Sequence, residues 1–312
     1  MGKHPPANYG ITAVIALLLS VGLILAGVIQ IITALLTLPV LACKGRNAFH
    51  SIQSAVWRSI VTFLSVGLNP FWCARMVWVG DNPGPPKGKM GSVFFINHRS
   101  NADAWFSAWG ITRMCHEARY VYKSSLKKIP FFGWNLQLAG DLAVEFGDKS
   151  KIVAMMENAK EALRQGYNVA VFPEGTRSPS GMLQEFKPGF FKICAELGCP
   201  AVPIVMLGTE KAWPLGFKMG CASVQVCVGE PLDCSEIEGP EQIMEAMEQA
   251  MTTIATQVLE DGDSGAPLTD PFLTKEPYPW WTPPDSIKDL PKEEQVKLLR
   301  AGKTHERGKK IF

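Results

Sequence analysis

Residues 94–103, which read Phe-Phe-Ile-Asn-His-Arg-Ser-Asn-Ala-Asp, join an apolar run to a polar break. The apolar run that ends at Ile96 predicts a buried strand, and a helix is expected to begin near Ser100 with Asp103 in its first turn. A strand end, His98 and a carboxylate therefore lie close together in the sequence.

His98 and Asp103 are suited to general base catalysis. A histidine titrates near neutrality, and its second ring nitrogen needs an acceptor that fixes the tautomer and stabilises the imidazolium. Asp103 can fold back to supply that acceptor. The same residues also fit a helix capping box, in which Ser100 is the N-cap and Asp103 accepts from backbone N–H groups. This stretch alone leaves catalysis and capping both open.

The composition excludes several classes of protein. The chain has 312 residues and is 47% hydrophobic, which allows one large core plus a membrane segment, or two modest domains. A formal net charge of +2 excludes a strongly basic nucleic-acid binder on global balance but leaves a local basic patch open, and we expect no nucleic-acid partner. The eight cysteines have no Cys-x-x-Cys pair and no zinc-ligand spacing, so we expect reduced, buried cysteines and no metal site.

An uncharged apolar segment extends from Ile11 to Ala42. It is long enough to cross a bilayer and too long for the apolar region of a cleaved secretory signal. Gly22, Gly27 and Pro39 leave open two shorter halves that re-enter one leaflet. Positive charges follow the segment, which predicts that the C-terminal side faces the cytosol.

Residues 52–79 are apolar and rich in tryptophan, but Arg58, Pro70 and Arg75 interrupt them. This composition predicts an interfacial helix or a shallow hairpin on the membrane, with an ordinary buried helix as the alternative. Residues 1–80 are therefore expected to form a membrane anchor.

Strand and helix signals alternate after a turn-rich linker at residues 81–89. The expected strands are Val93–Ile96, Arg119–Tyr122, Leu142–Phe146, Asn168–Phe172, Val202–Met206 and Ser223–Val228. The expected helices are Ala102–Arg113, Ser150–Gln165, Gly189–Leu197 and Glu241–Leu259. This alternation predicts an α/β fold, a mixed sheet flanked by helices over residues 81–260, with functional groups on loops at strand ends.

Residues 261–312 are rich in proline and tryptophan and predict an extended tail with one helical signal at residues 293–300. The chain ends in Lys309-Lys310-Ile311-Phe312, which resembles the dilysine signal for retrieval to the endoplasmic reticulum. A basic terminus is also often only a solvated end, so both interpretations stay open.

Four blocks, in the same order, resemble the glycerolipid acyltransferase family, typified by lysophosphatidic acid acyltransferases. They are His-x-x-x-x-Asp at residues 98–103, Lys-Ser-Ser-Leu with a following Ile-Pro and Gly at residues 123–133, Phe-Pro-Glu-Gly-Thr-Arg-Ser at residues 172–178, and Val-Pro-Ile-Val with a following Gly-Thr at residues 202–209. The resemblance implies that His98 takes the proton from an acceptor hydroxyl and that Asp103 orients the ring. It also implies direct transfer without an acyl-enzyme, and the absence of a Gly-x-Ser-x-Gly elbow from the sequence agrees with this.

The block Glu174-Gly175-Thr176-Arg177 is physically suited to an anion. Gly175 lets the backbone approach closely, Thr176 can donate a hydrogen bond, and Arg177 can bind phosphate through two N–H groups. The resemblance implies that the four residues bind the glycerophosphate part of the acceptor. The alternative is a turn in which Arg177 pairs with Glu174.

Two further cations are candidate substrate-binding residues. Lys123 matches the basic position of the family's second block and is expected to contact acceptor phosphate or coenzyme A, or else the membrane surface. Arg99 is the cation next to His98. Where the family commonly has an arginine, this chain has Phe146. Lys149, Lys151 and Lys187 are candidate substitutes, and each is otherwise a plain surface lysine.

The sequence therefore predicts an acyl-CoA-dependent O-acyltransferase that esterifies a lysoglycerophospholipid at a phospholipid membrane of the endoplasmic reticulum, with no tightly bound cofactor. The expected acceptor is 1-acyl-sn-glycerol 3-phosphate, which gives phosphatidic acid. The alternatives are another lysophospholipid or glycerol 3-phosphate acyltransferase, a CoA-independent transacylase, and a catalytically silent lipid-binding membrane protein. The oligomeric state and the acyl-chain preference stay open.

Overall fold

The computed structural model describes residues 9–86, 88–114, 117–214, 216, 218–260, 270–271, 277–278, 283 and 287–301. Within these residues, seven strands form one sheet in the order β1-β7-β6-β2-β5-β3-β4. The strands β6, β2, β5, β3 and β4 are parallel, whereas β7 is antiparallel to β6 and β1 is parallel to β7. The bounds are β1 Trp72–Trp78, β2 Val93–Ile96, β3 Arg119–Lys123, β4 Leu142–Val144, β5 Val169–Val171, β6 Ala201–Leu207 and β7 Ala222–Val228. The predicted mixed sheet and its six expected strands are confirmed.

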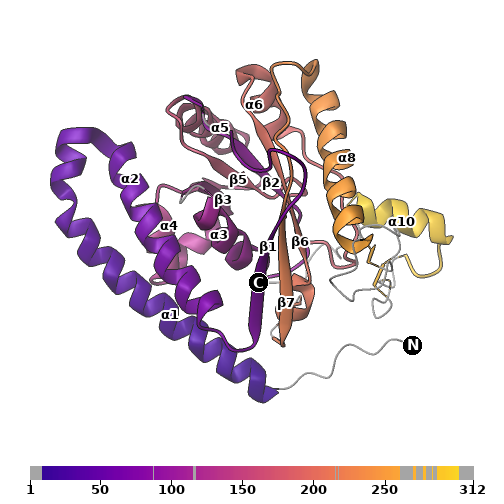
Figure 1. Ribbon diagram of the computed structural model, residues 1–312, viewed down its shortest axis with the longest axis horizontal. Helices are drawn as coiled ribbons and strands as arrows, with labels where there is room; N and C mark the ends of the chain where they lie inside the picture. The colour runs from indigo at the N-terminus through magenta and orange to yellow at the C-terminus, as the bar shows by residue number, and fades with distance from the viewer. Residues whose placement is uncertain are drawn as a thin grey trace.

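Helices cover both faces of the sheet (Figure 1). One face packs against α5 (Lys149–Arg164), α6 (Gly189–Leu197) and α8 (Gly239–Glu260), and the other against α3 (Asp103–Met114). Strand β2 is apolar throughout because both of its faces are covered. Val93 and Phe95 lie in the first of these cores, while Phe94 and Ile96 lie in the second. Successive side chains of a strand point to opposite faces, so a strand covered on both faces is apolar throughout.

The N-terminal part of the chain forms α1 (Tyr9–Leu36) and α2 (Leu38–Thr62), which pack on each other, and α2 has a kink at the non-helical Gly45. The chain turns at Thr37, and Pro39 lies in the first turn of α2, where proline is tolerated. The predicted segment from residue 11 to 42 is therefore not one continuous helix. The side chain of Gln30 joins the pair to the rest of the fold, because its amide nitrogen donates to Gln53 O and Asn135 O at 3.3 and 3.4 Å.

Helix α1 has a buried stripe and an exposed apolar face. The buried stripe repeats at helical spacing and consists of Ile15, Leu19, Gly22, Ala26, Gly27 and Gln30. The apolar residues of this face that are more than 40% exposed to solvent include Leu17, Val21, Ile24, Leu25, Val28, Ile32, Leu35 and Leu36. By length and composition, α1 is the one helix among the described residues that could cross a bilayer. Its apolar face indicates membrane association.

The prediction of an interfacial helix for residues 52–79 is wrong beyond Gly67. A helix does cover the first part, as α2 and the short π-helix at Phe63–Gly67. The second part is strand β1, which pairs with β7 over seven residue pairs from Trp72 to Trp78. The α/β unit therefore begins before the expected boundary at residue 81, because its edge strand comes from the region assigned to the anchor.

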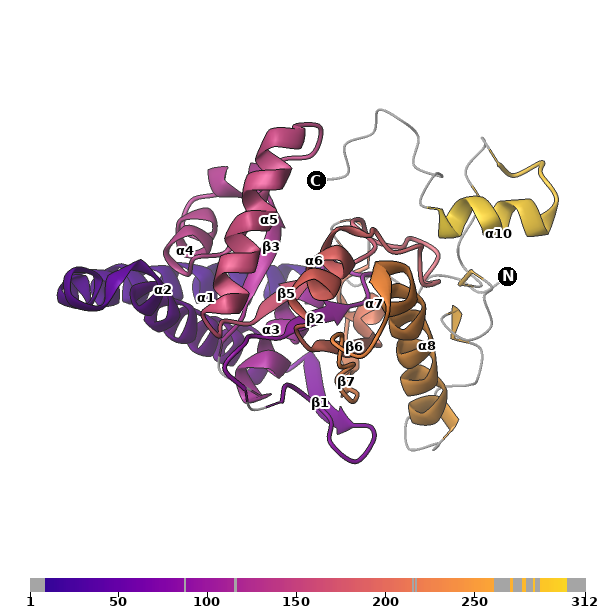
Figure 2. The ribbon, with the colours of Figure 1, turned by 90° about the horizontal axis from the view of Figure 1, so that it is seen from above.

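The short connecting elements and the tail complete the fold. Helices α4 (Phe132–Leu138) and α7 (Thr209–Ala212) and the 3-10 turn at Ser124–Lys128 are additional to the predicted elements. Helix α10 (Lys292–Arg300) agrees with the helical signal in the tail. Figure 2 shows α10 at the end of the molecule remote from α1 and α2. The predicted dilysine signal at residues 309–310 lies outside the described residues.

Candidate active site

Several of the predicted site residues lie at one edge of the sheet. His98 lies two residues beyond the end of β2, Glu174 follows β5, and Lys123 ends β3. Because these strands are parallel neighbours, their carboxyl ends meet at the same edge. In open α/β sheets this is the edge at which ligands bind.

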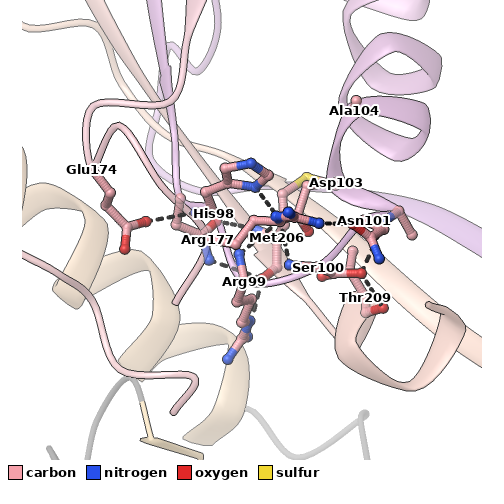
Figure 3. Close-up of polar contacts among 12 residues, drawn as sticks. His98, Arg99, Ser100, Asn101, Asp103, Ala104, Glu174, Arg177, Met206 and Thr209 are labelled. Atoms are coloured by element: carbon pink, nitrogen blue, oxygen red, sulfur yellow. Dashed lines mark hydrogen bonds and ion pairs between the residues drawn. The ribbon is translucent and has the colours of Figure 1, made fainter. Parts of the chain in front are cut away.

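His98 and Asp103 form a hydrogen-bonded pair, with 2.8 Å between Nδ1 and Oδ2 (Figure 3). The Asp103 side chain is fully buried, whereas the His98 side chain is 20% exposed. The His98 ring also stacks on Phe172, with 4.1 Å between ring centroids. A neutral ring that donates from Nδ1 carries its lone pair on Nε2, so this geometry gives the arrangement of a general base and its orienting acid.

Asp103 also has the capping role that the sequence left open. Its Oδ2 accepts from the backbone N–H groups of Arg99 and Ser100, both at 2.7 Å, in addition to the imidazole. The hydroxyl of Ser100 accepts from Ala102 N at 2.9 Å and lies 2.8 Å from Thr209 O. The two interpretations are therefore not exclusive, because one carboxylate oxygen both fixes the loop and orients the ring.

Glu174 is buried and holds the backbone of His98. Its Oε1 accepts from His98 N at 2.6 Å, and its Oε2 accepts from Gln184 N at 3.0 Å. Burial raises the pKa of Glu174 to about 8, although both backbone hydrogen bonds oppose the shift. The carboxyl group thus lies inside the protein, where it supports the loop of His98 rather than facing an anion.

The rest of the β5–α6 loop continues this support and then reaches the surface. Ser178 N donates to His98 O at 2.7 Å, so the loop binds the backbone of His98 on both its N–H and its carbonyl side. Gly175 has a φ of 73°, in the left-handed region that favours glycine. Gly175 is exposed, and Thr176 and Arg177 are half-buried.

Arg177 lies beside the dyad. Its guanidinium donates to the side-chain oxygen of Asn101, rather than pairing with Glu174 (Figure 3). Burial lowers the pKa of Arg177, and the nearby charge of Asp103 opposes that shift. A cation therefore adjoins the predicted base.

Part of the chain is similar to known acyltransferases. Residues 82–207 match the family model described as Acyltransferase. These residues form an acyltransferase domain. The chain is 27% identical over 195 residues to the chloroplastic 1-acyl-sn-glycerol-3-phosphate acyltransferase LPAT1 of Arabidopsis thaliana, covering 62% of this chain and 51% of that protein. It is 29% identical over 170 residues to the 1-acyl-sn-glycerol-3-phosphate acyltransferase of Pseudomonas aeruginosa, covering 54% and 64%.

The chain also resembles a solved structure. The crystal structure of PlsC, the 1-acyl-sn-glycerophosphate acyltransferase of Thermotoga maritima, matches with a TM-score of 0.59 and 22% identity, over 82% of this chain and 96% of that one. This likeness establishes the fold. The chain spans about half the length of the Arabidopsis relative.

Two of the predicted substrate-binding residues of the acyltransferase domain occupy different environments. Lys123 is exposed at the end of β3, which lies next to β5 at the active edge. Arg99 is only 1% exposed and turns away from the His98 ring into the protein (Figure 3). Its charged contacts are with protein groups, including Asp270 and Glu210. Arg99 therefore does not share the accessible surface of Arg177.

Phe146, which stands after β4 where the resemblance implies an arginine, is 61% exposed. Of the three candidate substitutes, Lys151 pairs with Glu145 at 2.9 Å. Lys187 lies closest to the predicted anion loop, since its Cγ would be 3.4 Å from a Cβ added to Gly175. Among these lysines, Lys187 is the one that the fold brings to the loop of Arg177.

Other residues of the site had little or no local signal in the sequence. Asn97 holds β2 to β6, because its side chain accepts from Met206 N at 2.7 Å and donates to Met206 O at 3.2 Å. The stacking of Phe172 on His98 and the contact of Asn101 with Arg177 both join segments that are distant in sequence. Within the described residues, no group of three or more His, Cys, Asp or Glu side chains is arranged to hold a metal ion.

A cavity of about 600 Å³ lies elsewhere, along the free edge of β4. Its lining includes Arg46, His50, Arg119 and Lys127, and it does not include His98. This polar cavity is therefore distinct from the predicted active site.

Proposed function

We propose that this protein is a membrane-bound O-acyltransferase that transfers an acyl group from acyl-CoA to the free hydroxyl of 1-acyl-sn-glycerol 3-phosphate, giving phosphatidic acid. One observation carries the proposal. The imidazole of His98 is oriented by the buried Asp103 and adjoins the cation of Arg177 on the loop after the neighbouring strand. The names of the curated relatives support the acceptor, since several are 1-acyl-sn-glycerol-3-phosphate acyltransferases.

The dyad performs the proton transfer in this proposal. Nε2 of His98 accepts the proton of the acceptor hydroxyl while that oxygen attacks the thioester carbonyl carbon. The new C–O bond forms, the C–S bond breaks, and the proton passes from His98 to the departing thiolate. The carboxylate of Asp103 stabilises the imidazolium in between, and such a base contributes about 10²–10⁴-fold to the rate. Arg177 holds the acceptor phosphate, which a guanidinium binds well.

The membrane anchor in this proposal is the α1–α2 pair, lying against one leaflet. The buried stripe of α1, from Ile15 to Gln30, packs along the protein, so this helix is not free to leave the domain as a separate span. Its opposite face exposes leucine, isoleucine and valine side chains, which favour insertion into lipid. Both lipid substrates then reach the site laterally. The location in the endoplasmic reticulum, with the domain facing the cytosol, rests on Lys309-Lys310 and on the charges after the anchor.

A second acceptor is favoured by one specific observation. Phe146 occupies the position of the family's arginine, which leaves the phosphate site with fewer cations than the resemblance implies. A lysophospholipid with another head group, such as lysophosphatidylcholine, is therefore the alternative substrate.

The test is an acyl transfer assay on the purified protein in vesicles with labelled acyl-CoA. The acceptors are 1-acylglycerol 3-phosphate, lysophosphatidylcholine and glycerol 3-phosphate, and a parallel reaction without acyl-CoA tests the transacylase alternative. We expect labelled phosphatidic acid from the wild type and a loss of about 10²–10⁴-fold in His98→Ala. The matched control is His50→Ala, because His50 is a half-buried histidine that bonds Leu138 O at 2.7 Å.

Three results contradict the proposal in different ways. If a folded His98→Ala variant retains the wild-type rate, His98 is not the general base. If transfer to lysophosphatidylcholine is faster than transfer to 1-acylglycerol 3-phosphate, lysophosphatidylcholine becomes the proposed acceptor. Absence of transfer to any acceptor by the folded wild type favours the catalytically silent lipid-binding protein.

A further inference from the structure

Arg99 joins the loop of His98 to the C-terminal segment of the chain. Its Nη1 donates to Asp270 Oδ1 at 3.0 Å and to the hydroxyl of Tyr278 at 3.1 Å. Its Nη2 donates to Met206 O at 3.0 Å. Burial by itself would lower the pKa of Arg99, but the surrounding acidic groups outweigh it and hold the pKa well above its usual value. Arg99 is therefore a fixed cation beneath the predicted catalytic loop.

Tyr278 also binds the second loop of the site. Its backbone N–H donates to Ser180 O at 3.0 Å. Its ring packs on Gly181, where an added Cβ would lie 2.3 Å from a ring carbon. Gly181 also has a φ of 80°, which favours glycine. Ser180 and Gly181 belong to the same β5–α6 connection as Arg177, so one tyrosine contacts both loops of the candidate site.

Helix α10 binds the same connection further along. Glu185 N donates to Arg300 O at 2.8 Å, and Met182 forms a small apolar cluster with Ile287 and Leu299. The C-terminal segment lies beyond residues 82–207, which match the family model. A part of the chain outside the matched domain is thus attached to both of its functional loops.

We propose that Asp270 and Tyr278 are positioning residues for acyl transfer, which hold the loop of His98 against the loop of Arg177 by binding Arg99 and Ser180. This inference rests on the proposed function of the same site. Asp270 balances the buried charge of Arg99, and Tyr278 links Arg99 to Ser180. If either link is lost, His98 and Arg177 are no longer fixed relative to each other, and a displacement of about 1 Å can cost about 100-fold in rate.

The experiment compares the full-length variants Asp270→Asn and Tyr278→Phe with the wild type. Asp270→Asn removes the nearer of the two acidic charges beside Arg99, the other being Glu210, and Tyr278→Phe keeps the ring packing but removes the hydroxyl. The matched control is Asp289→Asn, an exposed acid of the same C-terminal segment. The measurements are the folded fraction, Tm, kcat per folded molecule, KM for both substrates, and the rate at which diethyl pyrocarbonate modifies His98, with modification sites assigned by mass spectrometry.

We expect kcat of Asp270→Asn to fall by about 10-fold to 100-fold while KM for acyl-CoA changes less than about 2-fold. The rate of His98 modification should rise, since a loosened ring is more accessible, while Asp289→Asn behaves as the wild type. If Asp270→Asn does not fold, the same result is expected in smaller degree from Tyr278→Phe, because its ring still fills the space against Gly181.

The inference is overturned if the folded variants keep the wild-type kcat and the wild-type His98 modification rate, even where Tm falls, because the contacts are then only structural. Failure of the proposed function looks different. In that case the wild type transfers no acyl group, and the modification rate of His98 alone decides whether Asp270 and Tyr278 position the ring.

Discussion

Replacement of Glu174 with glutamine tests whether this acid positions His98 or binds substrate. The two carboxyl oxygens of Glu174 accept from His98 N at 2.6 Å and from Gln184 N at 3.0 Å. The side-chain amide of glutamine has one accepting oxygen and one NH2 group, which can only donate. The NH2 group must therefore face one of the two backbone N–H groups, and no hydrogen bond can form there. We therefore expect Glu174→Gln to lose one buried hydrogen bond, at a cost of about 1–3 kcal/mol in the free energy of unfolding.

The stability difference should depend on pH. Burial raises the pKa of Glu174 from 4.5 to about 8, so the folded protein keeps a proton that the unfolded chain releases. The folded state then binds more protons between these pH values, and the stability of the wild type falls as the pH rises through that window. The full interval corresponds to a loss on the order of 5 kcal/mol. Glutamine does not titrate, so the variant should be less stable than the wild type near pH 5 by about 1–3 kcal/mol. Near pH 8 it should be the more stable of the two, because the wild type has by then lost more than that deficit.

Two measurements check this reasoning. Chemical denaturation from pH 5 to pH 8 gives the free energy of unfolding of both proteins, with Glu185→Gln as the control, since Glu185 is a neighbouring exposed acid. Steady-state kinetics should show a lower kcat for Glu174→Gln, by about 10-fold or more, with an unchanged acceptor KM. A raised acceptor KM with an unchanged kcat would instead assign Glu174 to substrate binding. If the difference in unfolding free energy between the wild type and Glu174→Gln does not change with pH, Glu174 is not protonated in the folded protein.

Three further predictions concern the dyad, the cation and the membrane face. Asp103→Asn keeps the shape of the side chain but removes the charge that stabilises the imidazolium of His98. We expect kcat to fall by about 10²–10⁴-fold while the circular dichroism spectrum stays unchanged. An unaltered kcat would exclude the orienting role of Asp103. Arg177→Met should raise KM for the phosphorylated acceptor by about 10-fold or more without raising KM for acyl-CoA, and equal changes in both would place the phosphate elsewhere. The double substitution of Ile32 and Leu35 by glutamate, on the exposed face of α1, should weaken vesicle binding in a flotation assay without lowering Tm, whereas full retention on vesicles would exclude this face as the membrane contact.

The sequence predicts a strand most directly where both of its faces are buried. Strand β2 is an unbroken apolar run because helices cover it on both sides. Strand β1 was missed because it is only partly buried and contains Arg75, and because its tryptophan-rich sequence also fits a membrane surface. Its assignment depends on pairing with β7, about 150 residues further along the chain, and no local pattern carries that information.

The same distinction between local and distant partners applies to the candidate site. The pairing of His98 with Asp103 was predictable because a loop and the first turn of a helix join them. The positions of Glu174 and Arg99 were not, because their partners are Gln184 in one case and Asp270 in the other. A sequence motif indicates which residue types lie in a site. Whether each side chain points into the protein or toward the surface depends on partners that are distant in the sequence.

His98 illustrates why the inward residues matter to the chemistry. Its side chain is oriented by Asp103, its N–H by Glu174, and its carbonyl oxygen by Ser178. All three contacts act on one residue whose ring remains partly exposed, so the predicted base is already fixed without substrate and need not be ordered on binding. In the proposed function, Glu174 and Arg99 contribute to acyl transfer by positioning His98, so their replacement should lower kcat rather than weaken acceptor binding.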